Sequence, residues 1–563
     1  MALSRRGFLK SGATAGAAVG LSSLVSTAEA DEDTARAPSG PGGTMIGVPF
    51  EPRDEVRVGV IGLGNRGTGM TQLFSQHPNV RVVAICDVRA QRVQAVADRL
   101  RADGHEQPAT YVGGDPSYES ALKAARRAQS DRDAGMPYTE LCARDDIDFV
   151  YSPTPWEWHF PVAMEAMRHG KHVGTEMPLS MELEHLWDLV KTSERTRCHC
   201  FLMEQIVYSQ YEMRLLRMAH EGLFGELLHG AGAYNHDIRE LLFGVEPHYY
   251  PPAWRRLWHT RRDACFYPMH GLAPVAAMMD VNRGDRFTTL VSSSSPGLGL
   301  AAYREEHVPR SHESWGETYV AGDRNICLIE TAKGRLIRAE HDVSTPHPYS
   351  RLNHIAGTKG LCEDFAGGPG TSGGGARIYL EPEMTDHRWR NLDDYADYDH
   401  WMWTDGDDPQ VGHGGADSKE VWRFVQMMRL GLVPDHDVYD GATWTVANPL
   451  STESLRRGRP VQVPDFTRGH WQEPRAGIDS PRPAASRAAA MAARLSRSAG
   501  VRGHGPSHCE RSALKSSRKR TVPSGAVTST SSKLALSPGS WRKPTRPRAC
   551  VASVVWSTCV PST

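Results

Sequence analysis

A glycine-rich motif is the first feature of this sequence that can do chemistry. The Gly-x-Gly-x-x-Gly pattern at residues 62–67 follows a short apolar run, 56–61, and precedes a helical pattern. In that context Gly62 allows a tight turn, Gly64 lets the backbone approach a pyrophosphate, and Gly67 lets the helix pack on the strand. The N–H groups at the start of the helix then face the phosphates. The motif therefore predicts a dinucleotide site.

A carboxylate ends the next predicted strand. Asp87 follows the apolar run 80–85 and lies 25 residues after Gly62. At that position a carboxylate accepts hydrogen bonds from the adenosine ribose and repels a 2′-phosphate. We therefore expect NAD rather than NADP as the cofactor. The alternative is that Asp87 is an ordinary turn residue.

A phenol and an imidazole are the candidate groups for proton transfer. Pro268 suits the first position of a helix, where its missing N–H is not needed. Tyr267 and His270 are three residues apart, so both side chains can project from one face of the first turn. Histidine titrates near neutral pH and can exchange a proton with a neighbouring hydroxyl. The alternative is a structural histidine that is hydrogen-bonded to a backbone carbonyl.

Alternating strand and helix patterns must position these groups. Residues 55–178 have the βαβ rhythm of a doubly wound parallel sheet. The strands predicted there are 56–61, 80–85, 147–151 and 171–173, with a helix at 161–169. We predict an α/β protein that begins with a Rossmann domain.

Strands dominate from residue 179 to 470. Predicted strands are 198–203, 227–234, 286–294, 325–331 and 335–343, and predicted helices are 183–195, 211–221 and 418–429. Glycine at the turn 332–334 indicates a hairpin. We expect an α+β domain with an open, mostly antiparallel sheet, whose last helix returns to the first domain.

The two ends of the chain differ from its body. Of the 65 Lys/Arg and 66 Asp/Glu in 563 residues, 16 and 3 lie in residues 471–563, so the body carries −14 and the tail +13. An acidic body argues against nucleic acid as a partner. The tail lacks apolar periodicity, and we predict that it is disordered. It is either a segment that binds polyanions or an out-of-frame reading of the end of the gene.

The first 30 residues resemble an export signal. Arg5 and Arg6 precede a Gly/Ala-rich stretch, 11–25, and residues 28–30 have the small-x-small form of a cleavage site. The stretch is too short to span a membrane. We expect a twin-arginine signal, a linker at 31–54, and a periplasmic or extracellular protein without a membrane span. No cysteine or histidine spacing indicates a metal site, and a homo-oligomer remains possible.

Three segments together resemble the glucose–fructose oxidoreductase and inositol dehydrogenase superfamily. They are the motif at 62–67, Thr154-Pro155 after a strand, and residues 170–178. Dehydrogenases of this superfamily carry Glu-Lys-Pro where this chain has Glu176-Met177-Pro178. Met177 has no titratable group and cannot transfer a proton as that lysine does. The chain therefore departs from the superfamily at a residue that its dehydrogenases use.

Residues 45–470 resemble a narrower family, glycoside hydrolase family 109, whose members are NAD-dependent N-acetylgalactosaminidases. The matching segments are 156–159, 232–239, 254–255, 267–274, 282–285, 412–415 and 464–469. The basic tail lies outside the family pattern. Gln205 replaces the family's asparagine and reaches farther with the same carboxamide.

The resemblance implies a set of site residues. NAD contacts are implied at Asn65, Arg66, Asp87, Trp156, His159, Glu176, Met177, Gln205, Tyr267 and His270. Substrate contacts are implied at Tyr234, Arg255, Tyr267 and Tyr349. The structural alternatives are core packing for Trp156 and a solvated or salt-bridged carboxylate for Glu176.

The resulting hypothesis is an exported glycosidase that hydrolyses terminal N-acetylgalactosaminides, with α-linked substrates favoured. In a redox-elimination mechanism, NAD takes hydride from C3, a base removes the C2 proton, the C1 substituent leaves, and water adds before the hydride returns. Tyr267 and His270 are the candidates for proton transfer. One alternative is an exported NAD(P)-dependent sugar oxidoreductase, against which Met177 and Asp87 argue. The other is a non-catalytic sugar-binding protein.

Overall fold

The computed structural model describes residues 43–113, 136–244, 254–363, 375–382, 385–405, 408–473 and 475–481. The predicted signal, the first part of the predicted linker and the tail beyond residue 481 lie outside these residues. Within the described part of the chain, no helix combines the length and apolar character of a membrane span.

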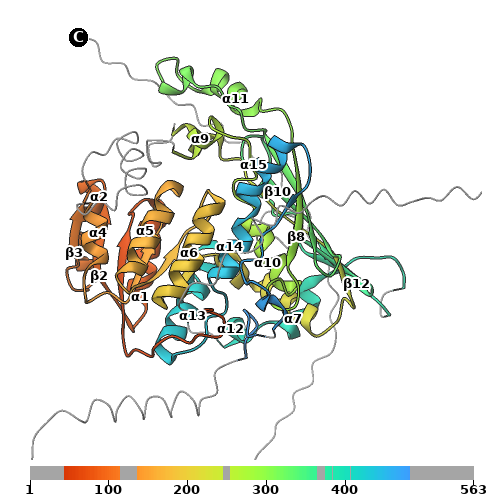
Figure 1. Cartoon of the computed structure of the whole chain (residues 1–563), viewed down its shortest axis with the longest axis horizontal. Coiled ribbons are helices and arrows are strands. Elements are labelled where there is room, and N and C mark those ends of the chain that lie inside the picture. The colour runs from red at the N-terminus through yellow and green to blue at the C-terminus, as the bar shows by residue number, and fades with distance from the viewer. Residues whose placement is uncertain are drawn as a thin grey trace, which may run out of the picture. The chain divides into compact units, whose positions relative to one another are not determined.

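The first sheet has six parallel strands in the order β3-β2-β1-β4-β5-β6 (Figure 1). Its strands are β1 (Val56–Ile61), β2 (Val80–Asp87), β3 (Ala109–Val112), β4 (Phe149–Ser152), β5 (His172–Thr175) and β6 (Cys200–Leu202). Its helices are α1 (Asn65–Gln76), α2 (Ala90–Ala102), α4 (Pro137–Cys142), α5 (Trp156–Arg168) and α6 (Leu183–Thr196). The central strands are apolar runs because helices cover a parallel sheet on both faces. The predicted doubly wound sheet is confirmed.

The Rossmann domain extends farther than the sequence predicted. β6 pairs in parallel with β5, through Val173 opposite Cys200 and Thr175 opposite Leu202. The helix α6 is therefore the crossover between these two strands rather than the first element of the second domain. The boundary predicted at residue 178 is about 25 residues too early.

The second sheet has nine strands in the order β14-β13-β12-β11-β7-β10-β9-β8-β15. The strands are β7 (Leu227–Asn235), β8 (Phe287–Ser294), β9 (Arg324–Thr331), β10 (Leu336–Asp342), β11 (His354–Gly357), β12 (Gly360–Glu363), β13 (Arg377–Leu380), β14 (Arg390–Asn391) and β15 (Val461–Gln462). β7 and β10 pair in parallel, and the other neighbours pair antiparallel. Gly334, with φ of 76°, forms the turn of the predicted β9–β10 hairpin. The predicted mostly antiparallel sheet is confirmed.

Helices and short 3-10 turns surround this second sheet. The helices are α7 (Gln210–His220), α8 (Arg239–Phe243), α9 (Trp254–His259), α10 (Met269–Met278), α11 (Gly299–His307), α12 (Trp401–Thr404), α13 (Ala416–Leu430), α14 (Val438–Thr445) and α15 (Ala447–Arg457). The 3-10 turns are η2 (Gln205–Tyr208), η3 (Glu313–Gly316), η4 (Leu392–Tyr398), η5 (His413–Gly415) and η6 (His470–Gln472).

Two contacts between elements position the site. α10 packs directly on β7, because a Cβ atom on Gly232 would lie 2.3 Å from the carbonyl carbon of Gly271. α13 returns to the first sheet, as predicted, and the ring of Phe424 packs 4.4 Å from that of Phe149 in β4. α13 also brings Asp417 to within 2.7 Å of Arg66, which follows the carboxyl end of β1, so the second domain supplies residues at this edge of the parallel sheet.

Both predicted flanking segments include packed residues. Met45 is buried and its N–H donates to the Tyr439 hydroxyl at 3.0 Å, while Phe50 packs among aromatic rings of the first domain. Arg475 forms ion pairs with Asp437 and Asp440, and Ile478 joins the core. The linker predicted at 31–54 and the disorder predicted from 471 are therefore wrong for residues 43–54 and 475–481. A few isolated apolar and charged residues carry this packing, and they produce no periodic pattern.

Candidate active site

The turn between β1 and α1 has the geometry of a nucleotide-binding loop. Gly62 has φ of 102°, and its N–H donates to the carbonyl of Cys86 at 2.8 Å. A Cβ atom on Gly67 would lie 2.0 Å from the carbonyl oxygen of Gly62, so only glycine lets α1 start this close to the turn. A Cβ atom on Gly64 would meet no atom within 4 Å. The open side of the turn is thus at Gly64, where the sequence predicted that a phosphate approaches.

Asp87 fixes this turn from the end of β2. Its Oδ2 accepts a hydrogen bond from the N–H of Leu63 at 2.6 Å, and its Oδ1 accepts one from the N–H of Arg89 at 2.9 Å. Each carboxylate oxygen can accept a further hydrogen bond. Asp87 therefore holds the turn in place, as the turn-residue interpretation predicted. Its oxygens can still accept hydrogen bonds from a ribose hydroxyl, as the cofactor-binding interpretation requires.

A buried ion-pair cluster follows the turn. Arg66 contacts Glu176 at 2.8 Å and Asp417 of α13 at 2.7 Å, and the hydroxyl of Tyr151 donates to Glu176 at 2.5 Å. Burial opposes the charge of Arg66, but Glu176, Tyr151 and Asp417 keep its pKa well above the usual range. Glu176 is thus salt-bridged, as its structural alternative predicted. The pair still lies at the carboxyl edge of the parallel sheet, where ligands of this fold bind.

An aromatic stack leads from the first domain to the second. Trp156, at the start of α5, lies parallel to Tyr267 with ring centroids 6.0 Å apart. The guanidinium of Arg255 lies 5.2 Å from the ring of Trp156 and 5.1 Å from that of Tyr267. Such cation–π contacts hold a guanidinium in place without using its hydrogen-bond donors. Trp156 therefore packs in the core, and it also supports Arg255.

The residues implied in substrate binding lie together. The ring of Tyr234 is 4.8 Å from that of Tyr267 and 6.0 Å from that of Tyr349. The Tyr234 hydroxyl lies 3.1 Å from Nδ1 of His236, a residue that the sequence analysis did not identify. Burial raises the pKa of Tyr234 to about 12, although the Arg255 charge acts in the opposite direction. Tyr234 is therefore a hydrogen-bond donor at neutral pH.

His270 pairs with a carboxylate rather than with a backbone carbonyl. Its Nδ1 lies 2.7 Å from Oε1 of Glu204, which also accepts the N–H of Ile206 at 3.2 Å. Its ring centroid is 5.1 Å from that of Tyr267. A carboxylate in this position fixes the orientation and the tautomer of an imidazole. The predicted Tyr267–His270 pair is therefore a triad with Glu204.

Glu204 was missed in the sequence analysis, although a signal was present. It lies two residues after β6, just as Asp87 ends β2 and Glu176 follows β5. Because the carboxyl ends of parallel strands meet at one edge, acidic residues at these ends converge. Because β6 was assigned to the second domain, Glu204 was not recognised as one of the acidic residues at the carboxyl ends of the parallel strands.

The remaining implied cofactor contacts are buried. His159 has ring nitrogens 2.6 Å from the carbonyl of Pro178 and 2.8 Å from that of Thr154, and burial lowers its pKa. Its ring therefore links two loops at the carboxyl edge of the sheet. Met177 and Gln205 are 2% and 1% exposed. Whether these three residues touch a cofactor stays a prediction.

The site fits a dinucleotide. Several buried polar atoms of its lining have no hydrogen-bond partner among the described residues, and they include Arg66 Nη2, Trp156 Nε1, Thr175 Oγ1 and Gln205 Oε1. Buried polar groups are normally satisfied, so these atoms are suited to meet a polar ligand. Asn65, Arg66 and Gly67 begin α1 and offer its first N–H groups to phosphates. Among the described residues, no group of three or more metal-binding side chains is found.

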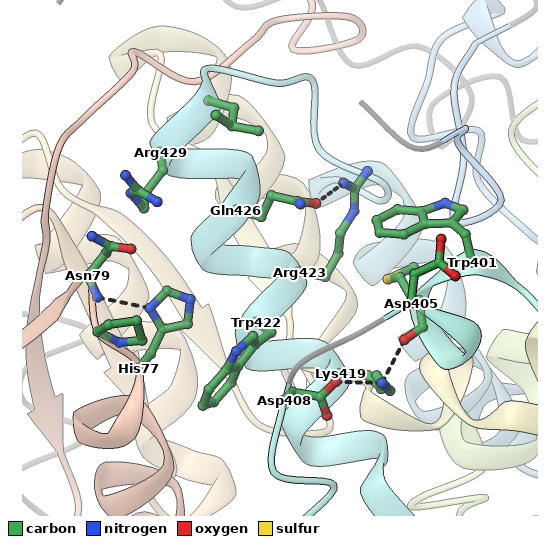
Figure 2. Close-up of a pocket in the computed structure, with 13 residues that line it drawn as sticks. His77, Asn79, Trp401, Asp405, Asp408, Lys419, Trp422, Arg423, Gln426 and Arg429 are labelled. Atoms are coloured by element: carbon green, nitrogen blue, oxygen red, sulfur yellow. Dashed lines mark hydrogen bonds and ion pairs between the residues drawn. The ribbon is translucent and has the colours of Figure 1, made fainter. Parts of the chain in front are cut away.

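A separate pocket of about 420 Å³ lies between the end of α1 and α13 (Figure 2). His77 and Asn79 line it, whereas the glycine turn is at the opposite end of α1. Lys419 pairs with Asp408 at 2.5 Å, and Arg423 donates to Gln426 at 2.7 Å. Because these charged groups pair with neighbouring side chains, the pocket offers no convergent set of reactive groups.

The fold and the site define a two-domain protein that binds NAD at a Rossmann sheet and brings side chains of an α+β domain to the carboxyl edge of that sheet. Residues 56–204 match the family described as "Oxidoreductase family, NAD-binding Rossmann fold", and residues 208–473 match "Glycosyl hydrolase 109, C-terminal domain". The chain belongs to glycosyl hydrolase family 109.

Relatives support this assignment over most of the chain. A family 109 protein of Streptomyces filamentosus is 52% identical over 474 residues, which are 84% of this chain and 90% of that protein. One of Saccharopolyspora erythraea is 48% identical over 482 residues, which are 85% of this chain and 98% of that protein. Both the predicted family and NAD as the cofactor are confirmed.

Solved structures share the fold. Levoglucosan dehydrogenase in complex with NADH and levoglucosan aligns with a TM-score of 0.51 and 16% identity, over 73% of this chain and all of that chain. An NAD-binding oxidoreductase from Klebsiella pneumoniae aligns with a TM-score of 0.53 and 16% identity, over 73% of this chain and 99% of that chain. At this identity the likeness concerns the fold alone.

Proposed function

We propose that this chain hydrolyses terminal N-acetylgalactosaminides, with α-linked substrates favoured, by redox-elimination. The observation that carries the proposal is the Tyr267–His270–Glu204 triad beside a loop where Met177 replaces the lysine of related dehydrogenases. The site keeps groups that can move protons but lacks the lysine that supports net oxidation of a free sugar.

The chain's own residues have separable tasks in this chemistry. Bound NAD would supply reversible hydride acceptance at C3 of the sugar, which acidifies the neighbouring C2–H. We assign proton transfer to His270, whose ring is oriented by the hydrogen bond to Glu204. Burial raises the pKa of Tyr267 well above its usual range, so its hydroxyl is a donor at neutral pH.

The other implied residues hold the sugar. The rings of Tyr234 and Tyr349 pack edge to face, and Arg255 lies over the ring of Tyr267. Their hydroxyl and guanidinium groups suit the hydroxyls and the acetamido oxygen of an amino sugar. We therefore propose sugar binding for these three residues and proton transfer for Tyr267 and His270.

The test uses nitrophenyl α- and β-N-acetylgalactosaminides, with and without added NAD. We expect hydrolysis without net accumulation of NADH, because the hydride returns in each turnover. Product formed in D₂O should carry deuterium at C2, since the C2 proton is removed and replaced from solvent. Hydrolysis that leaves C2 free of deuterium would contradict the redox mechanism. Steady NADH production from a free sugar, without hydrolysis, would contradict the glycosidase proposal itself.

We also propose that the chain is exported by the twin-arginine route, on the basis of Arg5, Arg6 and the stretch that follows them. Residues 1–30 fused to a folded fluorescent reporter should carry it out of the cytoplasm. Replacing both arginines with lysine should retain the reporter inside the cell.

A further inference from the structure

A buried guanidinium lies next to one of the residues implied in substrate binding. Arg351 follows Tyr349 by two residues, in the segment before β11, and is 1% exposed. Its Nη1 donates a hydrogen bond to the hydroxyl oxygen of Tyr349 over 3.5 Å. The sequence analysis did not identify this arginine, and the chemistry proposed above gives it no role.

Two side chains fix the guanidinium of Arg351. Its Nη2 pairs with Oε1 of Glu212 in α7 at 3.0 Å, and its Nε donates to Oδ1 of Asn353 at 3.1 Å. The guanidinium is planar and its donors form a rigid fork. Contacts at Nε and Nη2 therefore fix the plane of the group, so the third nitrogen, Nη1, points in one direction.

Two further hydrogen bonds connect this segment to the elements that carry the site. The carbonyl of the arginine accepts the N–H of Ala233 at 2.5 Å, and Ala233 precedes Tyr234 in β7. Nδ2 of Asn353 donates to the carbonyl of Gly271 at 3.4 Å, and Gly271 follows His270 in α10. The arginine is thus anchored to the same strand and helix that carry Tyr234 and His270.

The contact between Arg351 and Tyr349 determines where the phenolic proton can point. An arginine only donates hydrogen bonds, whereas a phenol can both donate and accept. Because Nη1 of Arg351 donates to the Tyr349 oxygen, the phenolic proton is directed away from the arginine and remains available to a ligand. The ring of Tyr349 packs edge to face against those of Tyr234 and His236, at 6.0 Å and 5.0 Å between centroids. Ring and hydroxyl are therefore both oriented.

Stability alone does not account for the Arg351–Glu212 pair. Taking two charges out of water is costly, and apolar residues of similar volume are often as good for stability or better. Burial opposes the charge of Arg351, but Tyr349 and Glu212 keep its pKa above the usual value. The guanidinium is therefore charged where it meets the phenol.

We propose that Arg351 is a positioning residue, which directs the hydroxyl of Tyr349 toward the sugar while Glu212 holds the guanidinium in place. The inference rests on the proposed function for the identity of the sugar, but the geometry that it describes exists without substrate. Loss of Arg351 should weaken sugar binding more than it slows the chemical step, because proton transfer is assigned to Tyr267 and His270.

The experiment is a double-mutant cycle with Arg351→Met and Tyr349→Phe, in which KM and kcat are measured on a nitrophenyl N-acetylgalactosaminide. Each single variant should raise KM about tenfold, which corresponds to the loss of one hydrogen bond to the sugar, and change kcat less. Because Arg351 acts through the Tyr349 hydroxyl, the double variant should be no worse than Tyr349→Phe. An unchanged KM in Arg351→Met, or effects that multiply in the double variant, would overturn the proposal.

A matched control is Arg214→Met. Arg214 also belongs to α7, is 2% exposed, pairs with Asp399 at 2.7 Å and donates to the carbonyl of Leu392 at 2.9 Å. This variant should have a lower melting temperature and an unchanged KM. A similar rise in KM here would show that loss of any buried guanidinium disturbs the site, and would contradict the proposal. If Arg351→Met does not fold, Arg351→Lys replaces it in the cycle with the same expectations, because lysine keeps the charge but not the planar fork.

Nuclear magnetic resonance provides a readout that needs neither substrate nor activity. Tyrosine that is isotope-labelled at Cζ reports on the hydrogen bonds of each phenol, and Tyr349→Phe identifies the Tyr349 signal. This signal should shift in Arg351→Met and stay in place in Arg214→Met. If the wild type hydrolyses no N-acetylgalactosaminide, the substrate proposal fails, and the Tyr349 signal still decides whether Arg351 positions this hydroxyl. A signal that is identical in the wild type and in Arg351→Met would overturn the inference.

Discussion

The nucleotide end and the sugar end of the site are built in different ways. The nucleotide end consists of one turn at residues 62–67 and of Asp87, and the geometry of the turn depends mainly on its backbone. The sugar end consists of side chains from β7, α9, α10 and the segment before β11, which meet Glu204 and Trp156 of the first domain. The residues of the nucleotide end are close in sequence, whereas those of the sugar end come together only when the two domains pack.

This difference determines how each end should respond to mutation. At the nucleotide end the glycine backbone either packs against another backbone segment or faces the phosphate. Replacing a glycine with alanine, which adds one methyl group, is therefore the informative change there. Side chains at the sugar end form a connected network, so removing one functional group while keeping its volume is the informative change. Comparing the two kinds of variant separates cofactor binding from proton transfer.

The largest effect is expected at the sugar end, from loss of the triad. His270→Ala should slow hydrolysis on the order of 10²-fold or more, because a general acid–base contributes about that much. Glu204→Gln should reduce turnover less, since it weakens the orientation of His270 but leaves the imidazole. The measurement is kcat on a nitrophenyl glycoside, with NAD affinity measured in parallel. Unchanged kcat in His270→Ala would exclude this residue from proton transfer.

The next effect is expected at the nucleotide end, from Gly67→Ala. The added Cβ would lie 2.0 Å from the carbonyl oxygen of Gly62, so the turn must shift. Overpacking of this kind costs about 1–3 kcal/mol, and we expect a lower melting temperature as well as weaker NAD binding.

The matched variant is Gly64→Ala, whose Cβ meets no protein atom within 4 Å. It should keep its melting temperature and lose NAD affinity, because the methyl group stands where the phosphate approaches. Equal loss of stability in both variants would show that Gly64 is needed for folding rather than for binding.

A smaller effect is expected from Asp87→Ala. The carboxylate should repel a 2′-phosphate, so its removal should increase the affinity for NADP relative to that for NAD. Because Asp87 also accepts the N–H groups of Leu63 and Arg89, affinity for both cofactors should fall. Titration with each cofactor measures the ratio, and an unchanged ratio would assign Asp87 to the turn alone.

The same division explains what the sequence could predict. The glycine turn, Asp87 and the strands β1, β2, β4 and β5 follow from local patterns, whereas β3 was not predicted and β6 was assigned to the second domain. Tyr267 and His270 could be paired because they are three residues apart. Their partner Glu204 is 66 residues away from His270, and Asp417 reaches Arg66 through the return of α13, so no local pattern connects them. Tyr234, Arg255 and Tyr349 were selected by resemblance, and only the packed domains bring them together.

The smallest effect is expected from removing the C-terminal tail. Removing residues 482–563 should leave the melting temperature and kcat nearly unchanged, because that segment has no apolar periodicity with which to form a core. Removing residues 475–563 should lower the melting temperature, because it also deletes Arg475, which pairs with the buried Asp437 and Asp440, and Ile478, which joins the core. It also deletes Asp479, which lies 2.5 Å from His220.

The melting temperatures of both truncated proteins are measured by thermal unfolding after purification. Equal melting temperatures for the two truncations would mean that residues 475–481 contribute nothing to stability, and a large drop on removal of residues 482–563 alone would show that the basic tail packs.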